Sequence, residues 1–461
     1  MSQPQQKNTL AIGMTFMSMI FFIFGFVTTF NITLADKFKA VFDLSNLQAQ
    51  LVNGAFFFTY FVLSLVTGKL IKKIGYKQGV IMGLLLVALG SFLFFPAAKA
   101  FSYPFFLIAI FVLASGVVFL QTAANPYVAA LGAPETASGR LNLTQALNSI
   151  ATTIAPLLAS FFVFKETAKI IGTNLTPEQI KENAMQAAQA VPVPFLIIGI
   201  VVIFVAVVIY FLKLPVISTE GVQGKSIWQY PHVVLGAIAI FCYVGAEVGS
   251  ASMVQKYLKD TLNFTASEAA KTIAIYWGGA MIGRFFGSIV LSNIANAAKK
   301  YMYIVAVLIF AFLVGWYLRG EVTGGLIFLG IAAINYFAIL LGKGRANITL
   351  AVFAVIAALL VLGTMLIDGQ VHGSLLIWVA CSIGFFNSVM FPNIFALGVD
   401  GLDKSEMSMA SGLINTLIVG GAVIPVLMGA IADGFGLKFA FILPLICYSF
   451  IMYYALAGSK H

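Results

Sequence analysis

The sequence predicts an all-α membrane protein with about 14 spanning helices. Of its 461 residues, 61% are hydrophobic and 9% are charged, and the mean hydropathy is +1.01. A water-facing surface needs about a quarter of its residues charged, which this chain cannot supply. Phe occurs 43 times and Gly 42 times, a combination common where helices pack within lipid. The composition therefore excludes a soluble multidomain protein.

Apolar runs long enough to cross the hydrocarbon, which takes about 20 residues, follow one another along the chain. Six precede a polar linker at 214–229, namely 10–35, 46–70, 79–99, 102–131, 142–163 and 192–213. Eight follow it, namely 230–258, 267–292, 301–318, 325–341, 347–367, 374–399, 408–431 and 437–457. The first run is too long for a signal-peptide core and lacks a small-residue cleavage site.

Two segments repeat a pattern. FLQTAANPYVAALG in the first half corresponds to FFNSVMFPNIFALG in the second, so that Gln121 and Asn387 each precede a proline by five residues. A helix containing Asn148 or Asn415 follows in each half. Parallel repeats of this kind build transporters, although chance matching of apolar sequence is the alternative. We predict an N-terminal six-helix bundle (1–213), a C-terminal bundle (230–461) related to it by a pseudo-two-fold axis, and an extra hairpin (301–341) inserted in the second.

An even number of spans places both termini on one side of the membrane. The short loops on that side are basic: Lys69, Lys72, Lys73, Lys77, Lys299, Lys300, Lys343 and Arg345. Cytoplasmic loops carry an excess of Lys and Arg, so we predict a multi-pass protein of the cytoplasmic (inner) membrane with both termini in the cytoplasm. The net charge of +10 is scattered and forms no basic stripe, which argues against a nucleic-acid partner.

Polar side chains within the spans are costly and mark a pathway or site. Gln145, Asn148 and Thr152 recur at i, i+3 and i+7, and Gln121 and Asn125 share a face at i, i+4. The predicted substrate contacts are Asn31, Gln121, Asn125, Gln145, Asn148, Tyr243, Trp277, Arg284, Asn387, Asn393 and Asn415.

Neutral amides beside aromatic rings suit a sugar. An amide both donates and accepts hydrogen bonds, as a hydroxyl does, and an aromatic face packs against the apolar side of a sugar ring. The alternative for any single amide is a bond between helices. Substitution of Gln145 or Asn148 by alanine is predicted to abolish hexose binding without preventing folding.

The charged residues within the spans limit how transport could be coupled to a proton or to Na⁺. Glu247 is the one acid that we place in the middle of a span, and Arg284 is the one similarly placed base. Glu247 could bind a proton or Na⁺, or it could neutralise Arg284. We expect no cofactor and no resident metal site, with Na⁺ near Glu247 as a possible co-transported ion.

Enzymatic chemistry is not indicated. No nucleophile–base arrangement is apparent, and the three histidines, His232, His372 and His461, are far apart in the sequence. The three cysteines lie in apolar segments without metal-ligand spacing and are interpreted as packing residues.

The segment LQTAANPYVAALGAPETASGRLNLTQALNS resembles the fucose and glucose/galactose transporter branch of the major facilitator superfamily. The same resemblance extends to TTFN, GKLIKKIGYKQG, YVGAEVGS, YWGGAMIGRFFGS and FNSVMFPNIFALG. It implies a major facilitator fold with twelve core helices, a midplane sugar site and alternating access. The family's sugar contacts correspond to Asn31, Gln145, Asn148, Asn387 and Arg284, and glucose/galactose members resemble this chain in the extra hairpin.

Two departures from the fucose members concern coupling. Proton-coupled members carry an aspartate at the position of Ile32 and a glutamate at the position of Gln121. Neither replacement can titrate, so proton coupling through these positions is not expected. A buried carboxylate is the usual proton carrier, and only Glu247 remains.

The sequence therefore predicts a monomeric transporter that carries a glucose- or galactose-type monosaccharide through the lipid bilayer by alternating access, coupled to sodium rather than protons. Facilitated diffusion is the first alternative. A non-transporting sugar sensor is the second, and we would expect it to carry a signalling domain or a long cytoplasmic tail.

Overall fold

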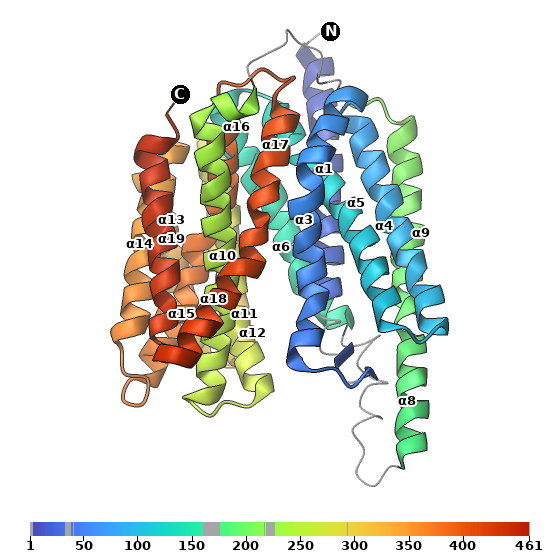
Figure 1. Ribbon diagram of the computed structural model, residues 1–461. Coiled ribbons are helices and arrows are strands. Elements are labelled where there is room, and N and C mark those ends of the chain that lie inside the picture. The colour runs from blue at the N-terminus through green and yellow to red at the C-terminus, as the bar shows by residue number, and fades with distance from the viewer. Residues whose placement is uncertain are drawn as a thin grey trace.

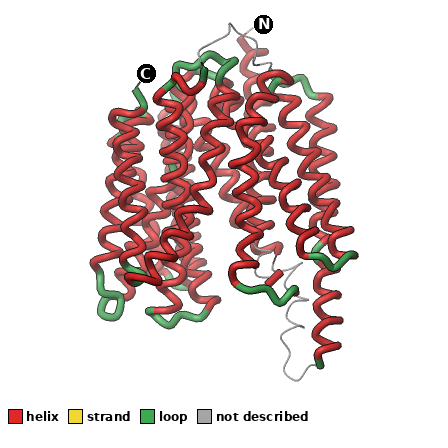
Figure 2. Tube along the Cα trace, viewed as in Figure 1, coloured by secondary structure: helices red, strands yellow, loops and turns green. Residues whose placement is uncertain are grey.

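The computed structural model describes residues 3–32, 38–39, 41–159, 176–215, 217, 226–292 and 294–460. The described chain is helical and contains no strand, and its loops gather at the two ends of a helical bundle (Figure 2). This confirms the all-α prediction. Within the described residues, thirteen helices are long and apolar enough to cross a membrane.

The first half contains α1 (Gln3–Ile32), α3 (Asn46–Ile74), α4 (Tyr76–Lys99), α5 (Tyr103–Ala130), α6 (Ala137–Ala159) and α9 (Pro192–Phe211). The second half contains α10 (Pro231–Asp260), α11 (Ala266–Val290), α12 (Ala297–Arg319), α13 (Val322–Leu341), α14 (Ala346–Leu366), α15 (Gly373–Asn387), α16 (Met390–Val399), α17 (Met407–Thr416), α18 (Gly420–Phe435) and α19 (Ile442–Tyr453). In Figure 1 the two halves lie side by side.

Helix α6 is the fourteenth element of the bundle and is not among the thirteen apolar helices. Its face carries Asn142, Gln145, Asn148 and Ser149, which lower its hydropathy. Residues 160–163 of the span predicted there lie outside the described residues, as do 33–35 of the first predicted span and most of the linker. The bundle helix that is least apolar is therefore one that carries two of the predicted substrate contacts, Gln145 and Asn148.

Two predicted spans are not continuous helices. The span at 374–399 divides into α15 and α16 around Ser388 and Val389, and the span at 408–431 divides into α17 and α18 around a short 3-10 turn (Leu417–Val419). Proline lacks an amide hydrogen and its ring clashes with the carbonyl four residues earlier. Pro392 therefore leaves the carbonyl of Ser388 without its helical donor.

The extra hairpin is present as α12 and α13. Helix α12 ends at Gly320, whose left-handed backbone (φ 72°) closes the helix without the steric penalty of a side chain. The structure also contains a short helix that the sequence analysis did not predict, α8 (Pro177–Ala190), capped by Thr176 and Gln179. Figure 1 shows α8 extending beyond the bundle on the side away from both termini.

The two halves contact each other on the side that carries both termini, called here the terminal side (Figure 1). Helices α3 and α17 cross so closely that a Cβ at Gly68 would lie 2.7 Å from the carbonyl oxygen of Ser408. A Cβ at Gly412 would lie 2.7 Å from the carbonyl oxygen of Ser64. The molecule is closed on this side, and in Figure 1 the halves diverge toward the other.

An ion pair spans the closed side. Lys72 Nζ on α3 lies 2.7 Å from Glu406 Oε1, which immediately precedes α17 and is buried. We expect Lys72→Glu to lower transport about tenfold, because two carboxylates would then face each other in the closed state. Initial uptake rates in proteoliposomes would measure this effect.

The charge-swapped double variant Lys72→Glu/Glu406→Lys is the control for this prediction. It restores opposite charges and is expected to recover most of the lost rate. Equal rates in the single and double variants would show that the ion pair has no role in closing this side.

Candidate substrate site at the midplane

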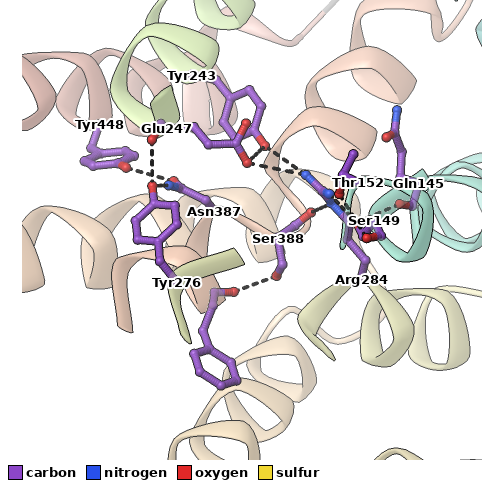
Figure 3. A network of polar contacts seen from close by, with 11 residues as sticks. Gln145, Ser149, Thr152, Tyr243, Glu247, Tyr276, Arg284, Asn387, Ser388 and Tyr448 are labelled. Carbon is purple, nitrogen blue, oxygen red and sulfur yellow. Dashed lines mark hydrogen bonds and ion pairs between the residues drawn. The ribbon is translucent and has the colours of Figure 1, made fainter. Parts of the chain in front are cut away.

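One buried guanidinium connects the two halves (Figure 3), and its side-chain partners lie near the middle of α6 and α10. Arg284 on α11 donates from Nη1 to Ser149 Oγ on α6. It also donates from Nη2 to Glu247 Oε1 and to the Tyr243 hydroxyl on α10, both at 3.4 Å. Arg284 is thus held by side chains of both bundles, which is where a site that changes during alternating access must lie.

The third anchor of Arg284 is a main-chain atom. Its Nε donates to the carbonyl oxygen of Ser388 at 3.2 Å. That oxygen is available because Pro392 cannot donate to it within the helix. The repeated proline motif of the sequence therefore has a direct use in the site.

Glu247 is paired on its own helix and across to α11. The Tyr243 hydroxyl, one turn earlier, donates to Glu247 Oε1 at 2.7 Å, and the Arg284 guanidinium lies at 3.4 Å. Removing one partner of a buried ion pair leaves an uncompensated charge and costs about 3–5 kcal/mol. The structural ion pair, one of the two roles considered for Glu247, is therefore formed.

A second group of contacts surrounds Asn387. Its Nδ2 donates to the Tyr276 hydroxyl at 2.6 Å, and its Oδ1 accepts from the Tyr448 hydroxyl at 2.8 Å. Tyr276 in turn donates to the carbonyl oxygen of Glu247 at 2.9 Å. Both amide atoms of Asn387 are thus used within the protein, and this residue holds the helices that carry the site.

The two amides of the polar stripe predicted on α6 differ in their hydrogen bonding. Asn148 donates from Nδ2 to the carbonyl oxygen of Phe21 on α1 at 2.9 Å, and it packs against Gly25, where a Cβ would collide with it. Gln145 is 8% exposed as a residue, and its side-chain amide makes no hydrogen bond within the described part of the chain. Gln145 is therefore the amide of α6 that is free to bind a ligand.

Three further predicted amides are buried with unpartnered atoms. Asn31 on α1 and Asn125 on α5 are fully buried, and neither amide atom of either residue has a hydrogen-bond partner. The carbonyl oxygen of the Gln121 side chain is also buried without a partner. Such groups are rare in folded proteins and support a role in contacting a solute.

Trp277 and Tyr243 are the two aromatic residues among the predicted substrate contacts. Trp277 is 38% exposed and packs edge-on against Tyr276, with ring centroids 5.3 Å apart. Tyr243 is buried and bonded to Glu247. Of the two, Trp277 offers a ring face that is not fully covered by protein.

Asn393 and Asn415 form a separate layer toward the terminal side. Asn393 Oδ1 accepts from Ser138 Oγ, and Asn415 Nδ2 donates to Thr122 Oγ1 at 3.2 Å. Both bonds join the first half to the second. The sequence pattern predicts these two amides as substrate contacts together with the midplane residues, and the structure separates them.

A resident metal site is not apparent among the described residues, in which no group of three His, Cys, Asp or Glu side chains gathers. At Glu247, a sodium ion would have to share the carboxylate with Arg284. Sequence reasoning missed Tyr276, Tyr448, Ser149 and Ser388. The position of Tyr276 beside Trp277 in a polar span was a usable signal for the first of these, while the other contacts depend on helix packing.

This arrangement, with two helical halves meeting at a polar midplane, has known counterparts. The family model of the Major Facilitator Superfamily matches residues 14–342. The chain belongs to the major facilitator superfamily. It is thus a member of a family of membrane transporters, as the sequence motifs predicted.

Individual members of the superfamily resemble nearly the whole chain. A glucose/galactose transporter of Brucella abortus is 38% identical over 99% of this chain and 96% of its own length. An L-fucose-proton symporter of Escherichia coli is 30% identical over 99% of this chain and 95% of its own length.

A solved superfamily structure matches the fold. The transporter FucP, crystallised in the outward conformation, superposes with a TM-score of 0.76 and 27% identity, covering 98% of this chain and 100% of that one. The predicted major facilitator fold is thus confirmed.

Proposed function

We propose that this chain transports a hexose of the glucose/galactose type by alternating access. The observation that carries the proposal is the Arg284 network, which joins both halves at the midplane beside the free amide of Gln145. Amides and an aromatic face match the hydroxyls and the apolar side of a sugar ring. The resemblance to a glucose/galactose transporter over almost the full length supports the same substrate class.

We further propose that the chain lies in the cytoplasmic membrane with both termini in the cytoplasm. The lysines at the end of α3 and the start of α4, including Lys69 and Lys73, lie on the terminal side. The positive-inside rule assigns such a side to the cytoplasm. On this assignment the closed side is cytoplasmic, and the hexose would enter from outside the cell.

For the driving force we propose sodium symport, using Glu247 and neighbouring neutral oxygens. Glu247 is a buried carboxylate in the midplane network, and the two titratable positions of fucose members are Ile32 and Gln121 here. Facilitated diffusion is the second candidate. It is favoured by Arg284, which already neutralises Glu247.

Counterflow of labelled glucose and galactose into proteoliposomes tests the substrate proposal. Exchange that is saturable and competed by unlabelled hexose is expected. Failure of glucose, galactose and fucose alike to exchange would overturn it. Repeating the assay with and without an inward sodium gradient separates the two driving forces, because only symport accumulates sugar above equilibrium.

Glu247→Gln is expected to abolish sodium-driven accumulation and to slow exchange about tenfold. The amide can still accept the hydrogen bond from Tyr243, but it leaves Arg284 without a counter-charge in a buried position. Accumulation and exchange would be measured in the same vesicles. Asp433→Asn, at an exposed ion pair with Lys256, is the matched control, and unchanged accumulation in Glu247→Gln would exclude this carboxylate from coupling.

A further inference from the structure

Four cations gather at the end of the extra hairpin that lies on the terminal side. Lys299 and Lys300 lie in the first turn of α12, and Lys343 and Arg345 lie in the short loop between α13 and α14. Three of these side chains are exposed, and Lys300 is partly exposed. We call the four residues the hairpin cation cluster. None of them belongs to the Arg284 network.

The packing of the hairpin brings the two parts of this cluster together. Helices α12 and α13 run antiparallel and so close that a Cβ at Gly315 would lie 2.4 Å from the Phe328 side chain. The same antiparallel register places the start of α12 beside the end of α13, where the hydroxyl groups of Tyr301 and Tyr336 are near enough to interact electrostatically. The four cations therefore surround one corner of the hairpin.

No acid balances these cations. Between Glu268 and Asp368 the sequence contains a single acidic residue, Glu321. Glu321 immediately precedes α13 and so lies at the opposite end of the hairpin. Among the described residues, no side chain forms an ion pair with a member of the hairpin cation cluster. The cluster therefore has a net positive charge that the described chain leaves uncompensated.

Several other cations on the terminal side are used within the protein. Lys72 pairs with Glu406. Lys77 Nζ donates to the carbonyl oxygen of Leu212 at 2.9 Å, and Arg140 donates to carbonyl oxygens at the end of α5. The positive-inside rule requires only an excess of basic residues in the loops. It does not account for four cations that two loops bring to one corner without a counter-charge.

Lys299 and Lys300 also occupy an unfavourable end of their helix. A helix N-terminus carries a partial positive charge, which stabilises anions and disfavours cations. Asn296 caps α12 by accepting a hydrogen bond from the backbone nitrogen of Lys299 at 3.0 Å, and the first turn contains no acid. An anion supplied from outside the chain would offset the two lysines and the helix terminus together.

The surface next to the cluster is apolar and exposed. Tyr301 and Tyr303 on α12 are 66% and 44% exposed, and Phe337 and Leu341 on α13 are 62% and 63% exposed. Tyrosines at the end of a spanning helix are typical of the boundary between membrane and water. A ligand that covers both the cations and this surface must have an anionic head and an apolar tail.

We propose that the hairpin cation cluster binds the headgroup of an anionic phospholipid, whose acyl chains lie along α12 and α13. A phosphate group accepts charge-assisted hydrogen bonds from Lys and Arg, and basic pockets between membrane helices suit such headgroups. On the topology proposed above, this lipid belongs to the cytoplasmic leaflet. The proposal does not depend on which solute the chain transports.

Lipid binding by the full chain tests the proposal. Native mass spectrometry of the detergent-solubilised chain would follow titration with phosphatidylglycerol or with phosphatidylcholine of the same acyl chains. We expect phosphatidylglycerol to bind at least about tenfold more tightly. Lys343→Gln/Arg345→Gln is expected to weaken its binding about 25-fold, because each cation near an anionic lipid contributes about fivefold.

Lys69→Gln/Lys73→Gln is the matched control, because it removes two exposed cations on the same side of the membrane from the first half. Its affinity for phosphatidylglycerol should stay within about twofold of the unmodified value. Should Lys343→Gln/Arg345→Gln fail to fold, Lys299→Gln/Lys300→Gln gives the same comparison. Hexose exchange is not part of this measurement, so its outcome is separate from that of the proposed function.

Three results would overturn the proposal. Equal affinity for the two lipids would show that the headgroup charge is not recognised. An equal loss of affinity in the Lys69→Gln/Lys73→Gln control would show that the lipid responds to the overall charge of this side. Displacement of phosphatidylglycerol by millimolar inorganic phosphate would show that the cluster takes a free anion and not a lipid.

Discussion

Arg284→Gln is expected to lower hexose transport at least about a hundredfold. The change leaves Glu247 as a buried carboxylate without a cation, at a cost of about 3–5 kcal/mol, and it removes a charged donor shared by Ser149, Tyr243 and the Ser388 carbonyl. Each 1.4 kcal/mol corresponds to a factor of ten. Counterflow in proteoliposomes containing equal amounts of folded protein would measure the loss.

Arg319→Gln is the matched control for this variant. Arg319 ends α12 and lies 4.0 Å from Glu321 at the surface, where a single ion pair contributes little. Transport by Arg319→Gln should stay close to that of the unmodified chain. An Arg284→Gln protein that retains transport would show that the guanidinium does not connect the two halves during the cycle.

Gln145→Ala is expected to weaken hexose binding about five- to tenfold while leaving thermal stability nearly unchanged. The amide of Gln145 has no partner among the described residues, so its removal costs the protein no internal hydrogen bond. A lost hydrogen bond to the sugar would cost about 1–1.5 kcal/mol. Titration calorimetry with glucose and galactose would report the change in affinity.

Asn148→Ala and Asn335→Ala complete this comparison. Asn148 bonds to Phe21 of α1, so we expect its replacement to lower stability as well as affinity. Asn335, a buried amide of α13, donates to the carbonyl oxygen of Phe385 at 2.7 Å. Its replacement should lower stability alone. Unchanged affinity in both Gln145→Ala and Asn148→Ala would move the site elsewhere.

The sequence predicts the helices well because crossing lipid demands long apolar runs, and such runs are visible without any tertiary information. The sequence predicts α6 from another signal: amide side chains recur at helical spacing within an otherwise apolar run. The break at Ser388 is not predicted, because Pro392 within a membrane helix does not by itself say whether neighbours will satisfy the freed groups. The break at Leu417–Val419 contains no proline, and Pro425 lies within α18.

The site could be predicted only in part. Arg284 and Glu247 stand out as charges within apolar runs, and the structure pairs them. Whether an amide binds a ligand or another helix depends on what packs against it, as the contrast between Gln145 and Asn148 shows. Likewise, Asn387 and Asn393 are six residues apart, yet one completes the midplane network and the other lies between the halves.

The oxygen that Ser388 offers to Arg284 belongs to the peptide unit, so no exchange of the Ser388 side chain can delete it. The Ser388 oxygen stays available because Pro392, four residues later, has no amide hydrogen. Any other residue at 392 would bring an amide hydrogen that competes for the same lone pairs. Substitutions elsewhere around this carbonyl, including at Ser388 itself, can thus leave the hydrogen bond intact, provided that Arg284 and Pro392 are retained.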